Sequence, residues 1–264
     1  MHKKLLSIAA AATLTVSAFS FAACGDDYYT GDALTGYQST DSKAESNGGF
    51  AVKKDGFVYF INGAEENTAD NEYGDVVKGS LMRIADSDLQ AGDYSKAETV
   101  VPMLFVAQNF DAGIYIYGDY VYYATPTTDK NLSGDVENTW IDFKRAKLDG
   151  SETMKSYYFR LEDNTSAYRF VEDENGVVYC LYEEDSALKS FNTSTKKTTT
   201  LVSGAKSSFF YDVKDPTSPY VYYTMSVTVD VDTSHASTSD YDQLYRVSAA
   251  ATATVNADEA SYTV

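Results

Sequence analysis

The chain has 264 residues and a formal net charge of −18, because 39 acidic side chains stand against 21 Lys and Arg. So acidic a protein repels phosphate backbones, which argues against nucleic acid as a partner and against a polybasic membrane patch. Metal cations, cationic peptides and glycans stay compatible with this charge.

Residues 1–23 have the layout of an export signal. Lys3 and Lys4 form a positive start, and residues 5–23 carry no charge and are rich in small and apolar side chains. That order is typical of a secretory signal peptide. Phe21-Ala22-Ala23 before Cys24 resembles the lipobox of bacterial lipoproteins, although Phe21 stands where an aliphatic residue is usual. The resemblance implies cleavage after Ala23 and attachment of diacylglycerol to Cys24, which would hold the protein on the outer face of the cell membrane.

Two other fates of this segment stay open. Ser20-Phe21-Ala22 offers small residues to an ordinary signal peptidase, which would release the protein. The uncharged residues 5–23 could instead remain as a membrane span, which needs about 20 apolar residues. Their many Ala, Ser and Thr side chains make them a weakly apolar span. Elsewhere the sequence contains no stretch long and apolar enough to cross a bilayer.

Residues 24–49 are predicted to be a flexible linker behind the lipid anchor. They are rich in Asp, Gly, Ser and Thr, so they bury too little apolar surface to offset their ordering entropy. In this interpretation the linker holds the folded part away from the membrane. With Cys24 used by the anchor, Cys180 has no partner for an internal disulfide, and its apolar neighbours predict a buried, inert thiol.

Residues 50–264 are predicted to repeat one β unit four times. The 23 tyrosines of the chain favour half-buried strands. Each copy begins with a short strand, a turn and a Tyr-centred strand, which is a strong hairpin signal, and two further β-prone runs follow. The expected strands are 50–52, 57–61, 81–84 and 98–101; 114–117, 120–123, 143–146 and 155–159; 168–171, 177–181, 188–191 and 197–202; and 209–213, 220–223, 244–247 and 261–264.

Four strands per unit, repeated about every 54 residues, predict an all-β, propeller-like array of about four four-stranded antiparallel blades. The Tyr-Val-Tyr-Tyr and Leu-Tyr-Arg motifs, with the turn Leu148-Asp149-Gly150, resemble propeller-type repeats of Gram-positive lipoproteins of unknown function. That resemblance implies fold and location but no activity. A truncated or open array, a small ring, and half of a ring completed by a partner all stay open. Arg83, Arg145 and Arg246 recur with the strands, which predicts a structural role such as pairing with a carboxylate.

The long insertions between the second and third strands of three copies hold the candidate binding residues. In a propeller the equivalent loops emerge on one face, so these insertions would gather carboxylates on one rim. That charge could recruit Ca²⁺ or a basic ligand, or it could be the ordinary hydrophilic surface of an acidic protein. The candidate residues are Glu65, Glu66, Asp70, Glu72, Asp75, Asp129, Asp135, Glu137, Asp230, Asp232 and Asp240.

Catalytic motifs are scarce. His235 is the only histidine after the signal segment, and the nucleophile-elbow, metalloprotease and phosphate-loop motifs are absent. The leading hypothesis is a cell-surface lipoprotein that acts as a non-enzymatic binding or scaffold module for a protein, peptide or glycan. The alternatives are an extracellular carbohydrate-active enzyme with paired carboxylates, and an accessory or sensor subunit of an envelope complex. Trp140, the single Trp, is either a core aromatic or a sugar-stacking surface residue.

Overall fold

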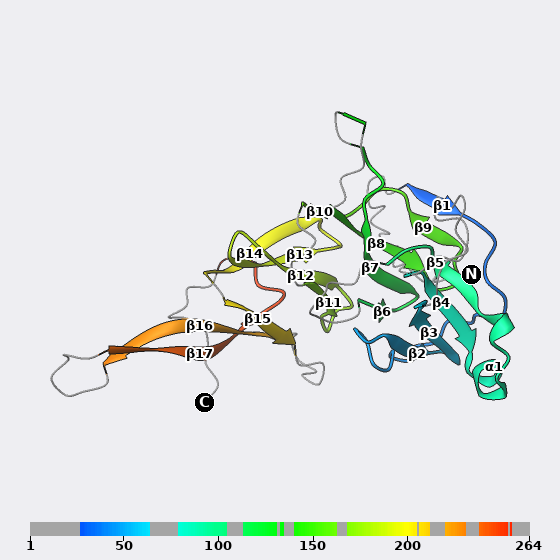
Figure 1. The fold of residues 1–264 in the computed structure, drawn as a ribbon, viewed down its shortest axis with the longest axis horizontal. Helices are drawn as coiled ribbons and strands as arrows, with labels where there is room; N and C mark the ends of the chain where they lie inside the picture. Colours follow the sequence, from blue (N-terminus) through cyan, green and yellow to red (C-terminus); the bar gives the residue numbers. More distant parts are fainter. Residues whose placement is uncertain are drawn as a thin grey trace, which may run out of the picture.

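The computed structural model describes residues 27–63, 79–104, 113–130, 133–134, 140–162, 168–204, 206–211, 220–230, 238–252 and 254. These residues form four antiparallel β-sheets that follow one another along the chain (Figure 1), which confirms the predicted all-β class. The helical parts among them are α1 (Asp86–Ala91) and a 3-10 turn, η1 (Tyr94–Lys96). Neither has the length and apolar character of a membrane-spanning helix.

Sheet 1 is a meander in the order β2-β3-β4-β5. Its first hairpin turns at Asp55 and Gly56, whose φ angles are +53° and +80°. Two successive left-handed residues match the right-handed twist of the flanking strands, which is why Asp-Gly favours this turn. The strands are β2 (Ala51–Lys54), β3 (Phe57–Ile61), β4 (Leu81–Ala85) and β5 (Glu98–Val101).

Sheet 2 has the path β6-β7-β8-β9-β1, and β10 pairs with the first residues of β8. The N-terminal strand β1 therefore adds a further strand beyond β9, to which it is antiparallel. The strands are β1 (Tyr28–Thr30), β6 (Tyr115–Tyr117), β7 (Tyr120–Pro126), β8 (Ile141–Lys147), β9 (Glu152–Met154) and β10 (Arg160–Leu161).

Sheets 3 and 4 differ in strand number within the described residues. Sheet 3 is a four-stranded meander, and sheet 4 has three strands. The last two strands of sheet 4 pair along their whole length and project as a hairpin away from the other sheets (Figure 1). The strands are β11 (Tyr168–Glu172), β12 (Val178–Glu184), β13 (Ala187–Asn192), β14 (Lys197–Ser203), β15 (Lys206–Tyr211), β16 (Tyr220–Asp230) and β17 (Thr238–Ser248).

The strands differ from the prediction in several ways. Sheet 2 has six strands where four were expected, because β9 and β10 both pair with β8 and β1 is added beyond β9. The run 155–159 lies between β9 and β10. The two ends of the insertion between the predicted strands 220–223 and 244–247 continue β16 and β17. That extension is favoured by the β-branched residues Val227, Thr228 and Val229 of β16, which suit a pleated strand. In sheet 3, Asn192 lies opposite Tyr179, one residue beyond the predicted strand 188–191. Asn192 therefore occupies the position that an arginine occupies in the other three sheets. The predicted strand 261–264 lies outside the described residues.

Consecutive sheets pack face to face, and always in the same direction. Side chains alternate between the two faces of a strand, so each middle sheet can be buried on both sides. Tyr59, Tyr122 and Tyr179, at the centre of the second strand, each join the cluster shared with the following sheet. Val121 and Val178, one position away, join the cluster shared with the preceding sheet. One sequence pattern therefore produces a repeated stacking contact.

The three recurrent arginines form a shared local structure. Each lies opposite the central Tyr of the second strand and stacks on the aromatic ring two residues before that Tyr. This placement gives a cation–π contact, worth about 0.5–2 kcal/mol according to burial. The pairs, with the distance from Cζ to the ring centre, are Arg83 over Phe57 (4.4 Å), Arg145 over Tyr120 (4.5 Å) and Arg246 over Tyr220 (4.4 Å). The predicted structural role is thus visible as stacking, and Arg83 also pairs with a carboxylate, that of Glu98 at 3.0 Å.

Residues 27–49, here called the strap, differ from the flexible linker that their composition predicts. The strap lies along sheets 1 and 2, where the backbone N of Gly31 and of Leu34 donate to carbonyls of the β8–β9 turn at 3.0 and 2.6 Å. Leu34 and Tyr37 pack against the cluster between the two sheets. Few apolar side chains suffice here because the folded sheets supply their partners.

The end of the strap covers the free edge of β6. The Asn47 amide accepts from Ile116 N at 2.7 Å and donates to Ile116 O at 2.8 Å, as a neighbouring strand would. Gly48 N donates to Ile114 O at 2.6 Å. Gly48 has φ +83°, and a Cβ there would lie 3.1 Å from the Tyr115 ring, so this close approach requires glycine.

Candidate functional site

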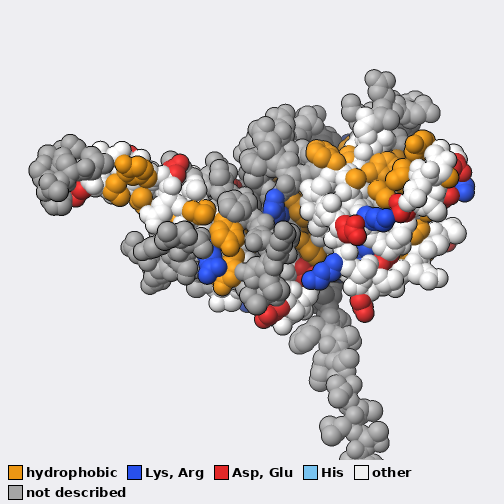
Figure 2. Space-filling model, turned by 90° about the horizontal axis from the view of Figure 1, so that it is seen from below, with side chains coloured by type: hydrophobic (Ala, Val, Ile, Leu, Met, Phe, Trp, Pro, Cys, Tyr) orange, Lys and Arg blue, Asp and Glu red, His pale blue; other side chains and the backbone are white. Residues whose placement is uncertain are grey.

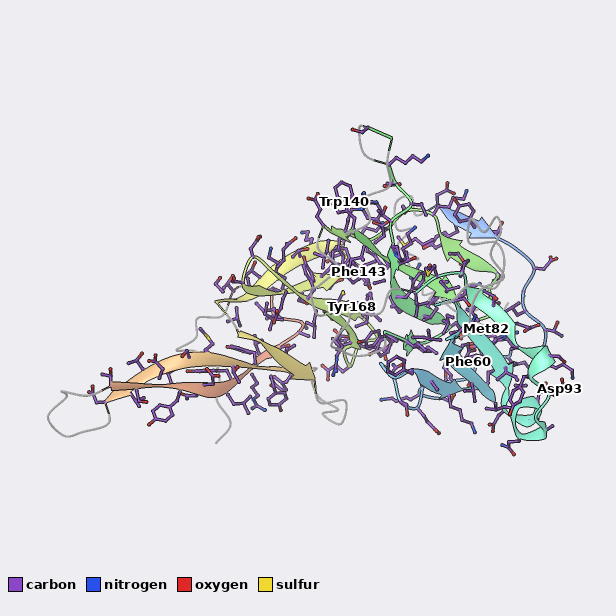
Figure 3. All side chains as sticks on the ribbon, in the orientation of Figure 1. Phe60, Met82, Asp93, Trp140, Phe143 and Tyr168 are labelled. Atoms are coloured by element: carbon purple, nitrogen blue, oxygen red, sulfur yellow. The ribbon has the colours of Figure 1, made fainter. Side chains whose placement is uncertain are left out.

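Charged and aromatic side chains gather at the start of β8. β10 places Arg160 opposite Asp142 of β8, and the chain leaving β7 adds Asp129. Trp140 stands directly before β8 and lies beside β10 in Figure 3. We call this group the Arg160 cluster; its members are Thr127, Asp129, Trp140, Asp142, Tyr157 and Arg160.

The Arg160 guanidinium ties the cluster together. Its Nε donates to Asp142 Oδ1 at 2.6 Å and its Nη2 to Asp142 Oδ2 at 3.2 Å. Nη2 also donates to Thr127 Oγ1 at 2.8 Å and to Asp129 Oδ2 at 2.6 Å. Charge-assisted bonds to two carboxylates fix the planar guanidinium, which is the use for which Arg is better suited than Lys.

Two aromatic rings lie against the same guanidinium. Arg160 Cζ is 4.4 Å from the centre of the Tyr157 ring and 5.0 Å from that of the Trp140 ring. Both distances are within the range of a cation–π contact. Trp140 is half-buried and Tyr157 is 40 % exposed, so the rings are held in place and still reach solvent.

The electrostatics of the cluster are those of a paired, partly desolvated site. The hydrogen bond to Asp142 raises the pKa of Arg160 above its usual value, against the opposing effect of burial. Burial lowers the pKa of the nearby Lys144, and the charge of Arg160 acts in the same direction. The Asp142 and Asp129 carboxylates oppose that decrease. The positive charges are therefore stabilised by the same two carboxylates.

This arrangement suits binding better than bond cleavage. Fixed aromatic rings beside a few convergent polar groups are typical of small-ligand sites. The Asp129 side chain is 59 % exposed, so its carboxylate is available to hydroxyl or amide donors of a ligand. The rings offer apolar faces to the C–H groups of that ligand.

The structure places the predicted site residues in two separate regions. Asp129 belongs to the Arg160 cluster of sheet 2, whereas Asp230 ends β16 and Asp240 lies in β17. The Asp240 carboxylate accepts from Thr228 Oγ1 at 2.7 Å within that hairpin. Figure 1 shows the far end of the hairpin well apart from the β7–β8 side of sheet 2, so these residues are not brought together. Cys24, Glu65, Glu66, Asp70, Glu72, Asp75, Asp135, Glu137 and Asp232 lie outside the described residues.

Metal binding and acid–base chemistry find little support within the described parts of the chain. There, no three His, Cys, Asp or Glu side chains are arranged to hold a metal ion. Burial raises the pKa of Glu172 and of Glu183, the change that a general acid requires. Glu172 ends β11 opposite Val178 at the start of β12, and Glu183 lies near the end of β12. They therefore sit at opposite ends of sheet 3 and do not form a pair.

The strap closes a shallow hollow over the β2–β3 turn. The hydroxyls of Ser42 and Thr40 donate to the Asp55 carboxylate, and Lys54 Nζ lies 3.0 Å from the same carboxylate and 2.8 Å from Ser42 O. Burial opposes ionisation of Asp55, but these hydroxyl and ammonium partners lower its pKa overall. The hollow, of about 360 Å³, is lined by Thr40, Ser42, Lys43, Glu45, Lys53, Lys54, Asp55 and Gly56. We regard it as a clasp that fastens the strap, because the buried charges satisfy one another.

Several residues of the Arg160 cluster could not be found from the sequence. Arg160 lies outside the recurrent arginine series, and Tyr157 falls in a run predicted to be a strand. The usable signal was Trp140 two residues before Asp142, an aromatic and a carboxylate at the entry of a predicted strand. The contact of Trp140 and Asp142 with Arg160 depends on how β10 pairs with β8.

Comparison with known proteins gives no relative. The chain matches no family model, no curated protein sequence and no solved structure.

The buried thiol predicted at position 180 is confirmed. Cys180 has no exposed surface and is packed between sheets 2 and 3. Burial raises its pKa well above the usual value, which keeps the thiol protonated and unreactive.

Proposed function

We propose that this chain is a lipid-anchored, non-enzymatic binding module on the outer face of the cell membrane, and that it binds a glycan at the Arg160 cluster. The lipid would be attached at Cys24. The four sheets would form an open, propeller-like array, as in the propeller-type lipoproteins that the repeat resembles. The observation that carries the proposal is the pair of partly exposed rings, Trp140 and Tyr157, held by Arg160 beside the exposed carboxylate of Asp129.

The propeller-like arrangement is supported by the repeated stacking. Three successive contacts between sheets use equivalent residues on equivalent faces. A repeat of this kind extends an array by adding units and leaves the connections on two opposite sides as binding surfaces. The strap occupies turns on one of these sides, at Asp55 and Asp119. The Arg160 cluster lies at the other ends of the strands, where the ligand would bind.

A glycan suits this cluster for two reasons. A sugar ring has an apolar C–H face that packs on an aromatic ring, and hydroxyls around its edge that bond to carboxylates. The cluster also keeps its charges paired, so an uncharged ligand can bind without leaving a buried ion unpaired.

The binding test is calorimetry and a glycan array with the full chain and three variants. We expect Trp140→Ala and Asp129→Asn each to weaken glycan binding by about 10-fold or more, since each removes one of few polar or stacking contacts. Asp240→Asn, which removes a carboxylate from the distant hairpin, should leave the affinity unchanged. Equal affinity of all variants would refute the assignment of the site. Release of free sugar from a bound glycan would refute the non-enzymatic part and favour the carbohydrate-active alternative.

The anchor is tested separately by mass spectrometry of the protein from cell membranes. We expect a diacylglyceryl group on Cys24 and cleavage after Ala23. The Cys24→Ser variant should accumulate as an uncleaved precursor. A cleaved Cys24→Ser protein that stays with the membrane would rule out lipidation.

A further inference from the structure

The distance between the proposed anchor and the folded body is short. Two residues separate Cys24 from Asp27, and Asp27 is already part of the fold. Its carbonyl accepts from Lys155 N at 2.7 Å, and its carboxylate lies 3.2 Å from Lys155 Nζ. Three residues of extended chain span at most about 11 Å. The residue at which the body begins therefore lies within about 11 Å of the acylated cysteine.

The first strand cannot swing away as a tether would. All three residues of β1 pair with β9. Arg145 Nη2 donates to the Tyr28 hydroxyl at 2.8 Å, and the guanidinium lies 5.8 Å from the Tyr28 ring centre. The bonds of Gly31 and Leu34 to the β8–β9 turn continue this attachment along the strap. A short link to a strand that is fixed on both its edge and its side chains restricts the orientation of the whole body.

The surface at this edge fits a lipid interface. Tyr29 of β1 is 65 % exposed, and Lys155 Nζ lies 5.2 Å from the centre of its ring. Tyrosine is enriched where membrane meets water, because its ring is apolar and its hydroxyl is wet. The lysine stem can lie along apolar surface while its ammonium reaches lipid phosphates.

We propose that, once Cys24 is acylated, the β1–β9 edge of sheet 2 lies against the phospholipid surface, with Tyr29 and Lys155 in contact with it. The β16–β17 hairpin, at the other end of the molecule (Figure 1), then lies away from the membrane. This inference rests on the proposed function only through the acylation of Cys24. The strap thus fixes the orientation of the binding module instead of holding it at a distance.

The test uses the acylated full chain in vesicles of phosphatidylcholine and phosphatidylglycerol. A fluorophore is attached at Tyr29→Cys or, as a matched control, at Tyr241→Cys, an exposed Tyr of the hairpin; Cys180 is buried and is not labelled. Nitroxide-headgroup lipids quench a fluorophore that lies at the lipid surface. We expect several-fold stronger quenching at position 29 than at position 241.

Each outcome separates the two proposals. Equal quenching at both positions, in protein whose mass shows the diacylglyceryl group, overturns the fixed orientation and leaves the anchored binding module standing. Absence of the diacylglyceryl group overturns the anchor and this inference with it. The Lys155→Gln variant adds a second readout. If the quenching at position 29 is weaker in this variant, the result supports direct contact of the edge with lipid phosphates. Quenching there that is unaffected by the change overturns the contact assigned to Lys155.

Discussion

Sheets 2 and 4 share a sequence pattern and differ in how much of it is buried. Sheet 2 packs against a neighbour on both faces and receives β1 at its outer edge. Sheet 4 has a described neighbour on one face, and its long hairpin extends beyond the other sheets (Figure 1). Val229 and Tyr241 of that hairpin are 40 % and 52 % exposed, and Figure 2 shows hydrophobic side chains along the projecting arm. The same local pattern thus contributes stability only where a second sheet covers it.

The largest expected loss of stability follows from a substitution in the aromatic core between sheets 2 and 3. Phe170 is 1 % exposed and contacts the Tyr115, Tyr122 and Phe143 rings, at 5.5 to 6.1 Å between centroids. Phe170→Ala should lower the free energy of unfolding by about 3–5 kcal/mol, through lost burial and a cavity. Urea denaturation measures this change.

The matched substitution lies in the hairpin. Tyr241→Ala should alter the free energy of unfolding by no more than about 0.5 kcal/mol, as exposed positions usually do. Comparable losses for the two variants would contradict the contrast between a covered sheet and an exposed arm.

A smaller difference is expected between two equivalent arginines. Arg83 is fully buried, bonds to Glu98 at 3.0 Å and to Thr35 O of the strap at 3.1 Å, and stacks on Phe57. Arg83→Ala should destabilise the protein by about 2 kcal/mol, because it removes a stacked and hydrogen-bonded ion. Arg246→Ala in sheet 4 removes chiefly a cation–π contact and should cost about 0.5–1 kcal/mol. Thermal unfolding of both variants checks the order, and a larger loss for Arg246→Ala would reverse it.

The strap should contribute measurably to the stability of sheets 1 and 2. Asn47→Ala leaves the backbone N–H and C=O of Ile116 without their amide partner, a loss of about 1–2 kcal/mol. Hydrogen exchange of the Ile116 amide should accelerate in this variant. Asn175→Ala, in an exposed turn of sheet 3, serves as the control with little effect. Unchanged exchange at Ile116 would mean that the strap does not protect the edge of β6.

The smallest expected change in stability depends on pH. It concerns Glu183, on the side of sheet 3 that faces sheet 4. Burial raises the pKa of Glu183, and its Oε1 is buried without a hydrogen-bond partner. Because the pKa of Glu183 is raised in the folded protein, its protonated form contributes stability to the native state below the ordinary pKa of a glutamate. This contribution is lost as the pH rises through the raised pKa. Glu183→Gln should therefore be more stable than the unchanged protein by about 1 kcal/mol at pH 7, and equal to it near pH 4.

Glu184→Gln is the matched control for this pH dependence. The Glu184 carboxylate pairs with Lys189 at 2.6 Å, so its loss should not stabilise the protein at pH 7. A stability gain for Glu183→Gln that persists unchanged at pH 4 would show that the effect is not one of charge.

The local rules of strand formation were readable from the sequence. Asp55-Gly56 and the aromatic and β-branched run Phe57–Ile61 define a hairpin through φ preference and β propensity, and both are intrinsic to a few neighbouring residues. The recurrence of these signals located fourteen of the sixteen expected strands; the exceptions are 155–159, which lies between two strands, and 261–264, which is outside the described residues. The amino-acid composition of the strap did not predict that it is ordered, because its order comes from partners in other segments, such as Ile116, to which Asn47 is hydrogen-bonded.

By itself, the sequence determined the β class, the repeat and the buried state of Cys180, since each follows from short-range pattern. The lipid site at Cys24 stays a prediction. Only the tertiary structure decided that the strap is docked, that Asn192 takes the place of an arginine, and that Arg160 joins Trp140 and Asp129. It also separated Asp129 from Asp230 and Asp240, which the sequence grouped on one rim. The physical reason is that these relations depend on strand register and on the direction in which sheets stack. Both are set by contacts between residues far apart in the chain.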